Sequence, residues 1–445
     1  MTWNSRFGWG IPALVLLAAA TCSAQSQAPQ RLTIKDAIHK GLERNLRGLD
    51  AGTRIEEAAG TRARRRASLL PRVRGESLAN LQNRSLRAFG ISLPGAPDVV
   101  GPFSNYDFRI YADQPLLDLQ SYHGWKASEK QEQAARQDYQ DARDVIIRQV
   151  AALYLNAQAS AARAEATESR VATAEALYTL ARERREAGVA TGIDVLRAQV
   201  QLANEQQRRL ESRNATQRAL LLLARNIGIS PGTPLELADS LQFKPTDAPR
   251  IPAAVTASLA ARADYLSLQS QREALLEQQK ASRARYLPRL SVNGNYGGIG
   301  RTPGEISGTG LLQATLSVTL FDRDRQGEQQ EIESRLRRLD QQMADLQLGI
   351  EEEIREALLT LESATEEVSV AEQGRMLAQR ELDLSRERFQ AGVTNNIEVI
   401  SAQDALARAQ ENYIIALTRH ADAKMALAKA LGATEQIYER YLGLP

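Results

Sequence analysis

The sequence predicts a mainly α-helical protein with a small β part and an internal duplication. Aromatic residues make up only 5% of the chain, and Ala, Leu, Gln, Glu and Arg are frequent, which favours extended helices over a compact mixed core. No proline occurs between Pro115 and Pro231 or between Pro303 and Pro445, so each half has room for long unbroken helices. Short segments of alternating apolar and polar residues predict the β part.

Two pairs of matching segments show the duplication. REAGVATGIDVLRAQ at 185–199 and FQAGVTNNIEVISAQ at 389–403 share seven residues at an offset of 204. ASLLPRVRGESLAN at 67–80 and ARYLPRLSVNGNYG at 284–297 match at an offset of 217. The first copy therefore holds 217 minus 204, or 13, extra residues, which fall in the Pro- and Gly-rich segment 89–103, a surface loop by composition.

Each copy is expected to run as helix, strand, loop, strand, long helix, shared motif and long helix. Thr33, followed by Asp36 three residues later, is typical of the N-cap of the first helix. Alternation of apolar and polar residues predicts four strands, at 73–79, 105–113, 289–296 and 311–321. These segments of 7–11 residues are close to the length, about 9–11 residues, of a tilted strand that crosses a bilayer.

The longest helices are expected to pack in the manner of coiled coils. Apolar residues of the second copy keep a 4-3-4-3 spacing, and the residues 204 places earlier keep the same register. These positions are Ile350, Ile354, Ala357, Leu361, Ala364, Val368 and Ala371, and Ile146, Val150, Leu153, Ala157, Ser160, Ala164 and Thr167. A continuous helix over 119–187 would be about 100 Å long. The Pro-rich segment 230–252 between the copies is expected to be irregular.

The N-terminal residues have the pattern of a secretory signal peptide. Arg6 supplies the charged region, residues 7–21 the apolar region, and residues 22–24 a small-residue cleavage site. The apolar run is shorter than the ~20 residues of a transmembrane helix. Cys22 is the only cysteine, so neither a disulfide nor a thiolate metal site is expected. Cys22 is also a candidate for lipidation, although cleavage after Ala24 fits the surrounding residues better.

Several classes of function are disfavoured by the sequence. His39, His123 and His420 are scattered, have no acid pair at ligand spacing, and are expected to lie at the surface. No phosphate-binding glycine loop, nucleophile elbow or zinc-protease helix occurs in the sequence. The net charge of +2 gives no basic field for nucleic acid. We therefore expect no enzyme activity, no cofactor, no metal and no nucleic-acid partner.

The order and duplication of the motifs resemble the TolC-like outer-membrane efflux protein family, the outer membrane factors of tripartite efflux and type I secretion systems. The resemblance rests on Leu-Pro-Arg at 70–72 and 287–289, on Asp118 and Asp322 after strands, and on the duplicated Ala-Gly-Val-x4-Asp/Glu-Val. It implies a homotrimer in the bacterial outer membrane, in contact with lipid. Four strands from each chain would form a 12-stranded β-barrel, continuous with a long periplasmic α-helical barrel.

The resemblance also assigns roles to the two shared motifs, which would lie at the tips of helix hairpins. It implies that the tips dock a periplasmic adaptor (membrane fusion) protein, which connects the channel to an inner-membrane RND or ABC pump. The docking residues would be Ala187, Gly188, Val189, Ala391, Gly392 and Val393, and the periplasmic aperture would be formed by Asp194, Thr394, Glu398 and Ser401.

Three aperture positions depart from the family pattern. Phe389 stands where a tyrosine is expected, Thr394 where a base is expected, and Ser401 where an acid is expected. The resemblance implies that Glu398 faces the lumen, where three copies would form an acidic ring that favours cations. The alternative is that Glu398 is a solvated acid near a helix start, where it interacts favourably with the helix dipole. Because of the departures, the polar lock of a closed entrance should be weaker, and the charge of the ring lower, than in the family pattern.

The predicted organisation is a signal peptide at 1–24, a first helix-strand-strand-helix repeat at 25–229, an equatorial linker at 230–252, a second repeat at 253–433 and a tail at 434–445. The predicted function is an outer-membrane channel-tunnel, the exit duct of an efflux or type I secretion system. The alternative is a periplasmic coiled-coil structural or scaffold protein without transport activity. That alternative explains the heptads and the signal peptide, but it does not explain four strands at matched places in the two copies.

Overall fold

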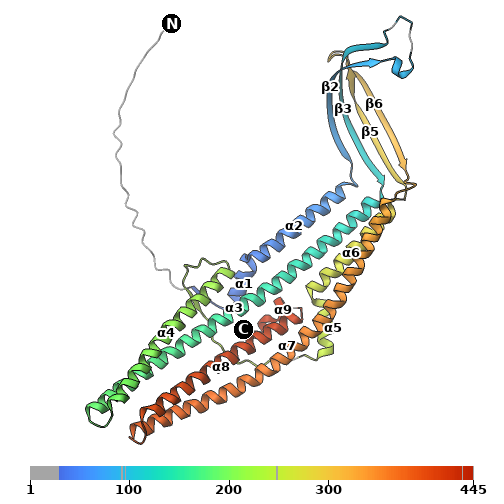
Figure 1. Cartoon of the computed structure of the whole chain (residues 1–445). Coiled ribbons are helices and arrows are strands. Elements are labelled where there is room, and N and C mark those ends of the chain that lie inside the picture. The colour runs from blue at the N-terminus through green and yellow to red at the C-terminus, as the bar shows by residue number, and fades with distance from the viewer. Residues whose placement is uncertain (1–29, 92–93, 96, 247–248, 433, 444–445) are drawn as a thin grey trace, which may run out of the picture.

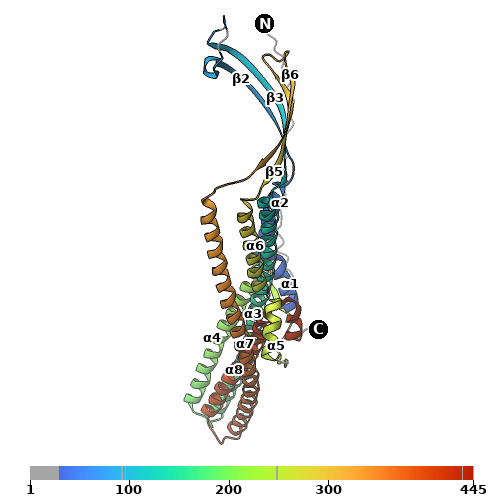
Figure 2. The same ribbon diagram turned by 90° about the vertical axis from the view of Figure 1, so that its right-hand side faces the viewer.

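The molecule is elongated, with long helices along most of its length and a four-stranded sheet at one end (Figures 1 and 2). The predicted signal peptide and Cys22 lie outside the described residues. The predicted mainly helical class with a small β part is confirmed. The structure is a computed structural model that describes residues 30–91, 94–95, 97–246, 249–432 and 434–443.

The two halves of the chain have closely similar element orders. The elements of the first half are β1 (Gln30–Leu32), α1 (Ile34–Arg44), α2 (Leu46–Ala67), β2 (Arg72–Ser85), the 3-10 turn η1 (Arg87–Phe89), β3 (Val99–Leu117), α3 (Leu119–Glu186) and α4 (Gly192–Asn226). Those that follow are β4 (Leu235–Leu237), α5 (Ile251–Ala261), α6 (Ala263–Ala284), β5 (Arg289–Gly300), β6 (Ser307–Ser317), α7 (Asp324–Gln390), α8 (Asn396–Ala430) and α9 (Thr434–Leu442). Within the segment predicted as an irregular linker lies the short strand β4, which pairs in parallel with β1.

The first helix of each half is broken in two, whereas the sequence predicts one helix. Asn45 (φ −68°, ψ 130°) separates α1 from α2, and Arg262 (φ −67°, ψ 122°) separates α5 from α6. The two breaks lie 217 residues apart, so the break is part of the duplicated pattern. Neither position holds a proline, so the sequence carries no strong signal for the break. The predicted N-cap at Thr33 is confirmed, because Thr33 and Asp36 form a reciprocal capping box.

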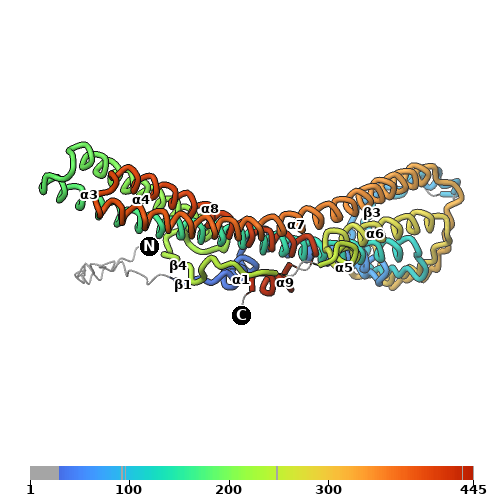
Figure 3. Tube along the Cα trace, turned by 90° about the horizontal axis from the view of Figure 1, so that it is seen from below, coloured from blue at the N-terminus to red at the C-terminus, as the bar shows by residue number. Residues whose placement is uncertain are grey.

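The long helices have the predicted length and the predicted buried positions. α3 has 68 residues and α7 has 67, each joined by a short turn to a helix of 35 residues. All but one of the heptad positions of the second copy are buried, and Ala371 is partly buried. Viewed from below, β1, β4, α1 and α9 lie together on one side of the row of long helices (Figure 3).

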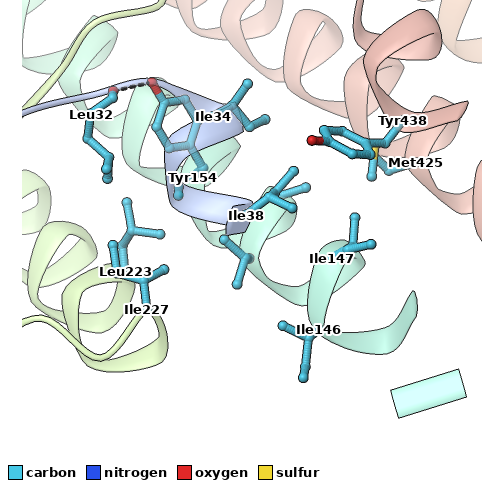
Figure 4. Close-up of a cluster of buried hydrophobic side chains, with 13 residues drawn as sticks. Leu32, Ile34, Ile38, Ile146, Ile147, Tyr154, Leu223, Ile227, Met425 and Tyr438 are labelled. Carbon is cyan, nitrogen blue, oxygen red and sulfur yellow. Dashed lines mark hydrogen bonds between the residues drawn. The ribbon is translucent and has the colours of Figure 1, made fainter. Parts of the chain in front are cut away.

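An apolar core lies where α1 crosses α3. Ile34 and Ile38 of α1 pack with Ile146, Val150 and other residues of α3 (Figure 4). The buried Tyr154 hydroxyl donates a hydrogen bond to the carbonyl of Leu32 (2.8 Å), which satisfies a polar group inside this core. An equivalent core lies under α5 in the second half, around Ile350 and Ile354 of α7. The two cores hold the short helices against the long ones in the middle of the molecule.

The sheet is antiparallel, has the order β2-β3-β5-β6, and has two faces of opposite character. Residues that pair directly across two strands point to the same face of the sheet. One face is apolar and contains the pairs Val73–Ala112, Ile110–Tyr296 and Leu290–Leu316. This face is exposed in the chain, and Leu312 on it is 80% exposed. The opposite face is polar. It carries the ion pairs Arg74–Asp113 (3.2 Å) and Arg109–Asp107, together with Asn293 and Gln313.

All four strands differ in their bounds from the predicted ones, and for two of the differences the pairing shows the reason. β6 is predicted at 311–321 but ends at Ser317. Ser317 pairs with Arg289, the first residue of the neighbouring strand β5, so residues 318–321 have no residues of β5 to pair with. The segment 89–103 is predicted as a loop, yet β3 already begins within it at Val99, which pairs with Ser85. In both places the pairing partner decides where the strand ends.

The prediction that all three histidines lie at the surface is wrong for His420. This side chain is 2% exposed, its ring lies 4.8 Å from that of Phe243, and burial lowers its pKa to about 4. It is a neutral residue of the core between α8 and the linker. His123 is half-buried beside Glu277 (2.8 Å), and His39 is exposed, as expected. Among the described residues no group of His, Cys, Asp and Glu is arranged to hold a metal ion.

No helix within the described ranges combines the length and the apolar character needed to cross a membrane.

Arg262 at the second helix break is a buried charge with two carboxylate partners. It pairs with Asp264 (2.7 Å) and with Glu353 of α7 (2.5 Å), and only 5% of its side chain is exposed. Gly432 lies against it with φ +74°, and a Cβ at that position would stand 2.4 Å from Arg262 Cγ. The break, α7 and the segment that follows α8 therefore meet at Arg262.

We expect Arg262→Met to destabilise the folded chain by about 1–3 kcal/mol, because it leaves the partly buried Asp264 without its partner, while the more exposed Glu353 keeps Lys429 (3.8 Å). Arg262→Lys keeps the charge but loses the paired geometry of the guanidinium, so its loss should be smaller. Thermal unfolding followed by circular dichroism measures both variants. Equal stability of Arg262→Met and the parent chain would contradict this role.

Asp144 of α3 is a buried carboxyl facing the start of α9. Burial raises its pKa to about 6, and repulsion from Asp141 adds to this, while hydrogen bonding from the Glu435 backbone opposes it. A raised folded-state pKa means that the folded chain binds the proton more tightly than the unfolded chain. Asp144 therefore lowers stability progressively as the pH rises from about 4, the pKa of an unfolded aspartate, through about 6.

Asp144→Asn should remove this pH-dependent cost while keeping the shape of the side chain. We expect the variant to unfold at a higher temperature than the parent chain at pH 7.5 and to lose this advantage at pH 4.5. Melting temperatures measured across this range test the expectation. A difference that does not change with pH would mean that Asp144 does not titrate in the folded state.

Candidate docking and aperture site at the helix-hairpin tips

The two shared motifs form the turns at the ends of the helix hairpins α3–α4 and α7–α8, which lie at the same end of the molecule (Figure 1). Gly188 has φ +76° and Gly392 has φ +75°, a conformation that favours glycine. Val189 N–H donates to the carbonyl of Arg184 (2.9 Å), and Val393 N–H donates to that of Arg388 (3.0 Å). Both turns therefore close their helix by the same hydrogen-bonded cap.

The predicted docking residues form two small exposed turns. A Cβ at Gly188 would meet no heavy atom within 4 Å, and one at Gly392 would meet only the Nη2 atom of Arg184 at 3.4 Å. Val189 and Val393, next to the glycines, are exposed apolar side chains. Each turn thus offers a surface of little bulk with one apolar side chain.

The helices that leave the turns begin with different caps. Asp194 forms a capping box with Thr191 at the start of α4 and accepts a hydrogen bond from the Thr191 backbone N–H (3.1 Å). Asn395 caps α8 by accepting from the N–H of Ile397 (3.1 Å). Glu398 is the equivalent of Asp194 in the second copy, but because Asn395 caps α8, the Glu398 side chain is free to make other contacts.

Glu398 is instead held by two residues of its own hairpin. The Nε atom of Arg388 lies 3.3 Å from one carboxylate oxygen, and the hydroxyl of Thr394 donates to the other. Arg388 was not among the predicted site residues, because it precedes Glu398 by ten residues and reaches it across the turn. Ser401 lies one turn further along α8 and is exposed. Three of the four predicted aperture residues thus carry polar contacts in this structure.

Two side chains, neither of them a predicted site residue, join the first hairpin tip to the second. Arg184 of α3 lies over the ring of Phe389 (4.8 Å to its centroid) and donates to the Phe389 carbonyl. Asn396, which is completely buried, donates from Nδ2 to the carbonyl of Asp194 (2.8 Å). A hint was present in the sequence, since Asn396 and Phe389 replace Gly192 and Arg185 of the first motif.

An apolar cluster surrounds these polar contacts and includes residues of both hairpins. Its members from the first hairpin are Leu177, Ala181 and Ala198, and those from the second are Ala378, Leu382, Phe389, Val399, Ala402 and Leu406. The two tips of one chain are thus joined by an apolar core and by directional hydrogen bonds.

Comparison with known proteins supports one family. The family model described as "Outer membrane efflux protein" matches residues 37–228 and 254–433, most of the chain, in two parts that follow the duplication. The outer membrane protein OprJ of Pseudomonas aeruginosa is 24% identical, over 83% of this chain and 78% of its own length. The alkaline protease secretion protein AprF of the same organism is 23% identical, over 94% of this chain and 88% of its own.

Solved structures show the same fold. The crystal structure of the CmeC outer membrane channel of Campylobacter jejuni covers 93% of this chain and 90% of its own, with a TM-score of 0.80 and 16% identity. At that identity the likeness concerns the fold alone. It extends over the helices and the sheet together.

Proposed function

Because this chain belongs to the outer membrane efflux protein family, we propose that three copies assemble into one continuous exit duct that docks a periplasmic adaptor at its helical tips. The protein is an outer-membrane channel of efflux or type I secretion systems and is not an enzyme. The trimer, the barrel and the adaptor contacts are the proposed part. The predicted domain boundaries belong to the same proposal, with the linker at 230–252 forming an equatorial collar.

The observation that carries this proposal is the sheet with one exposed apolar face and one polar face. Lipid accepts only the apolar face, and a four-stranded sheet leaves the outer edges of β2 and β6 unpaired. Unpaired strand edges are not tolerated in hydrocarbon, so the edges must pair with other copies. Three chains of four strands would close a 12-stranded β-barrel, with the polar faces of Arg74, Asp113 and Gln313 turned to the lumen.

The long helices support the same assembly. α4 and α7 lie at the edges of the helical layer and expose large apolar side chains, which a second copy would cover. These include Leu196, Val200, Leu348, Leu359, Leu377 and Leu384. Exposure of so many leucines on two edge helices favours a trimeric duct over the alternative, a periplasmic scaffold protein that acts as a single chain.

The tips would dock the adaptor through Ala187, Gly188 and Val189 and through Ala391, Gly392 and Val393, and the adaptor would connect the duct to an inner-membrane RND or ABC pump. Asp194, Thr394, Glu398 and Ser401 would line the aperture beside them. Since Arg388 neutralises part of the charge of Glu398, the acidic ring should be weak. The predicted secretory leader and possible lipidation at Cys22 remain part of the proposal.

Membrane extraction and electrical recording test the proposed function. The full chain should stay with the outer membrane in high salt, migrate as a heat-sensitive trimer, and conduct ions in a planar bilayer. Recovery as a soluble monomer would overturn the duct and favour the scaffold. If the trimer conducts ions but captures no adaptor from its own host, the duct is right and only the docking role of the tips is wrong.

A further inference from the structure

Lys424 of α8 is a buried cation with no carboxylate beside it in the described part of the chain. The residue is 3% exposed, and its Nζ atom donates a hydrogen bond to the carbonyl of Lys244 in the linker (3.0 Å). Burial, together with repulsion from Lys244, lowers its pKa to about 8. Arg262, another buried cation, has two carboxylate partners. Because a buried charge without a counter-charge is costly, an anion bound beside Lys424 would stabilise the folded chain.

A cavity of about 310 Å³ adjoins Lys424. Its walls come from α3, α8 and linker residues 238–244, with Ile34 at the start of α1 and Leu442 at the end of α9. A water molecule takes up about 30 Å³ in the liquid, so the cavity has room for a small organic molecule. All of the lining residues belong to one chain, so the cavity is present in a single copy of the protein.

His420, one helical turn before Lys424, lines the same cavity. Its Nε2 atom is buried and has no hydrogen-bond partner among the described residues, which is unusual for a buried polar atom. Because burial lowers its pKa to about 4, the ring is neutral at pH 7 and can carry its proton on Nε2. Lys424 has two further N–H groups besides the one bound to the linker. These donors on one wall of the cavity suit a ligand that only accepts hydrogen bonds.

The charged side chains around the cavity favour an anion of single charge. They are Lys424, Lys244 and Asp239, which together leave one positive charge. The Asp239 carboxylate is already engaged, because it accepts from the backbone N–H of Ile34 (2.7 Å) and lies 2.8 Å from the Tyr154 hydroxyl. A monoanion would balance the remaining charge, whereas a dianion would place an excess negative charge in a partly buried site.

Apolar side chains complete the lining. Leu155 of α3, Leu241 of the linker, Ile34 and Leu442 all contribute to the cavity wall. A bare inorganic ion would leave these side chains facing water, whereas a short aliphatic chain would cover them. The lining therefore fits a ligand with one anionic end and one small apolar end.

We propose that this cavity binds a small organic monocarboxylate. Its carboxylate accepts hydrogen bonds from Lys424 and His420 and supplies the counter-charge that Lys424 lacks. Its aliphatic part packs against Leu155 and Leu241, so the bound acid connects α8 to α3 and to the linker. The site lies apart from the hairpin tips and from the sheet, and it goes beyond the proposed exit duct because a single chain forms it.

Calorimetric titration of the full-length protein in detergent tests this proposal. Butyrate is the probe, and butyramide, which has nearly the same size but no charge, is the matched control ligand. We expect the parent chain to bind butyrate at pH 7 and to bind butyramide at least about tenfold more weakly, since a hydrogen bond to a charged group contributes more than one between neutral groups. Chloride is titrated as an anion without an aliphatic part and should also bind more weakly than butyrate.

Two substitutions on α8 locate the site. Lys424→Met removes the charge but keeps an unbranched apolar side chain, and it should weaken butyrate binding at least about tenfold. Lys429→Met is the matched control, because Lys429 lies on the same helix but outside the cavity lining, and it should keep the affinity of the parent chain. Circular dichroism checks that both variants are folded.

The outcomes separate this proposal from the exit duct. If the parent chain binds neither probe, or binds butyrate and butyramide alike, the cavity is not an anion site and the duct stands. If Lys424→Met binds butyrate as tightly as the parent chain, the binding occurs elsewhere and the proposal is wrong. If chloride binds as tightly as butyrate, the assignment to an organic carboxylate is wrong. Should Lys424→Met fail to fold, the comparison of the three probes on the parent chain still decides.

Discussion

Leu312→Arg is expected to abolish insertion of the protein into the outer membrane. Leu312 lies on the apolar face of β6 and is 80% exposed in the chain, so in the barrel its side chain would meet lipid. An arginine facing lipid near the bilayer midplane costs about 2–4 kcal/mol, and three copies in one barrel multiply that cost. Membrane fractionation and heat-sensitive trimer formation in cells measure the loss.

Gln313→Arg provides the matched control for this prediction. Gln313 follows Leu312 in the same strand but points to the polar face, where it pairs with Asn293. In the barrel its side chain would face water, so the same new charge should leave insertion and trimer formation close to those of the parent chain. If both variants insert equally well, the apolar face of the sheet does not contact lipid, and the membrane part of the proposed duct is wrong.

The internal duplication made the sequence informative, because each element could be compared between the two copies. The strands and the heptads could be predicted because alternation and the 4-3-4-3 spacing recur in both copies, and positions such as Ile146 and Ile350 are buried alike. The ends of strands could not be predicted in the same way. β6 ends at Ser317 because β5 supplies no partner beyond Arg289, and this depends on pairing between distant segments.

Residues that depend on distant contacts were the ones that sequence reasoning missed. Arg262 lies at a helix break with its side chain buried between Asp264 and Glu353, and no local pattern signals this burial. His420 was expected at the surface but is covered by Phe243 of the linker, about 180 residues earlier in the chain. Local patterns predict the elements, whereas burial of a single polar residue depends on what the fold places over it.

The tip motifs show the same division. Their turns were predictable, because the same Ala-Gly-Val sequence occurs in both copies between long helices. Gly188 and Gly392 adopt the left-handed conformation that commonly ends a helix. The contacts across the tips were not, since Arg184 and Asn396 act on residues of the other hairpin. The duplication gives six tips of two kinds in a trimer, and the differences between the kinds lie at these contact positions.

Gly188→Arg and Gly392→Arg are each expected to abolish export while leaving the trimer and its membrane insertion intact. Both glycines lie at exposed turns, so a bulky charged side chain can point into solvent without disturbing the helices behind it. The arginine side chain would occupy the apolar surface beside Val189 or Val393 that we propose as the docking surface for the adaptor. A buried charge without a partner at such an interface costs several kcal/mol, enough to remove binding.

The change in backbone must be separated from the change in surface. Gly188→Ala and Gly392→Ala impose the same left-handed conformation on a residue with a Cβ, at a cost of about 1–2 kcal/mol each, but add neither charge nor bulk. Export is measured, as resistance to the exported compound or as secretion, in a strain that lacks the parent gene and carries each variant. Export should therefore survive in the alanine variants and fail in the arginine variants.

Loss of export in all four variants would point to the turn conformation alone. Survival in all four would mean that the adaptor binds elsewhere on the helices. Because the two turns are equivalent by duplication but not identical in their neighbours, an unequal loss would show which kind of tip carries more of the docking energy. At Gly392 the new arginine also faces Arg184, whose Nη2 would lie 3.4 Å from a Cβ there, so the trimer content of Gly392→Arg is checked before its loss of export is assigned to the adaptor contact.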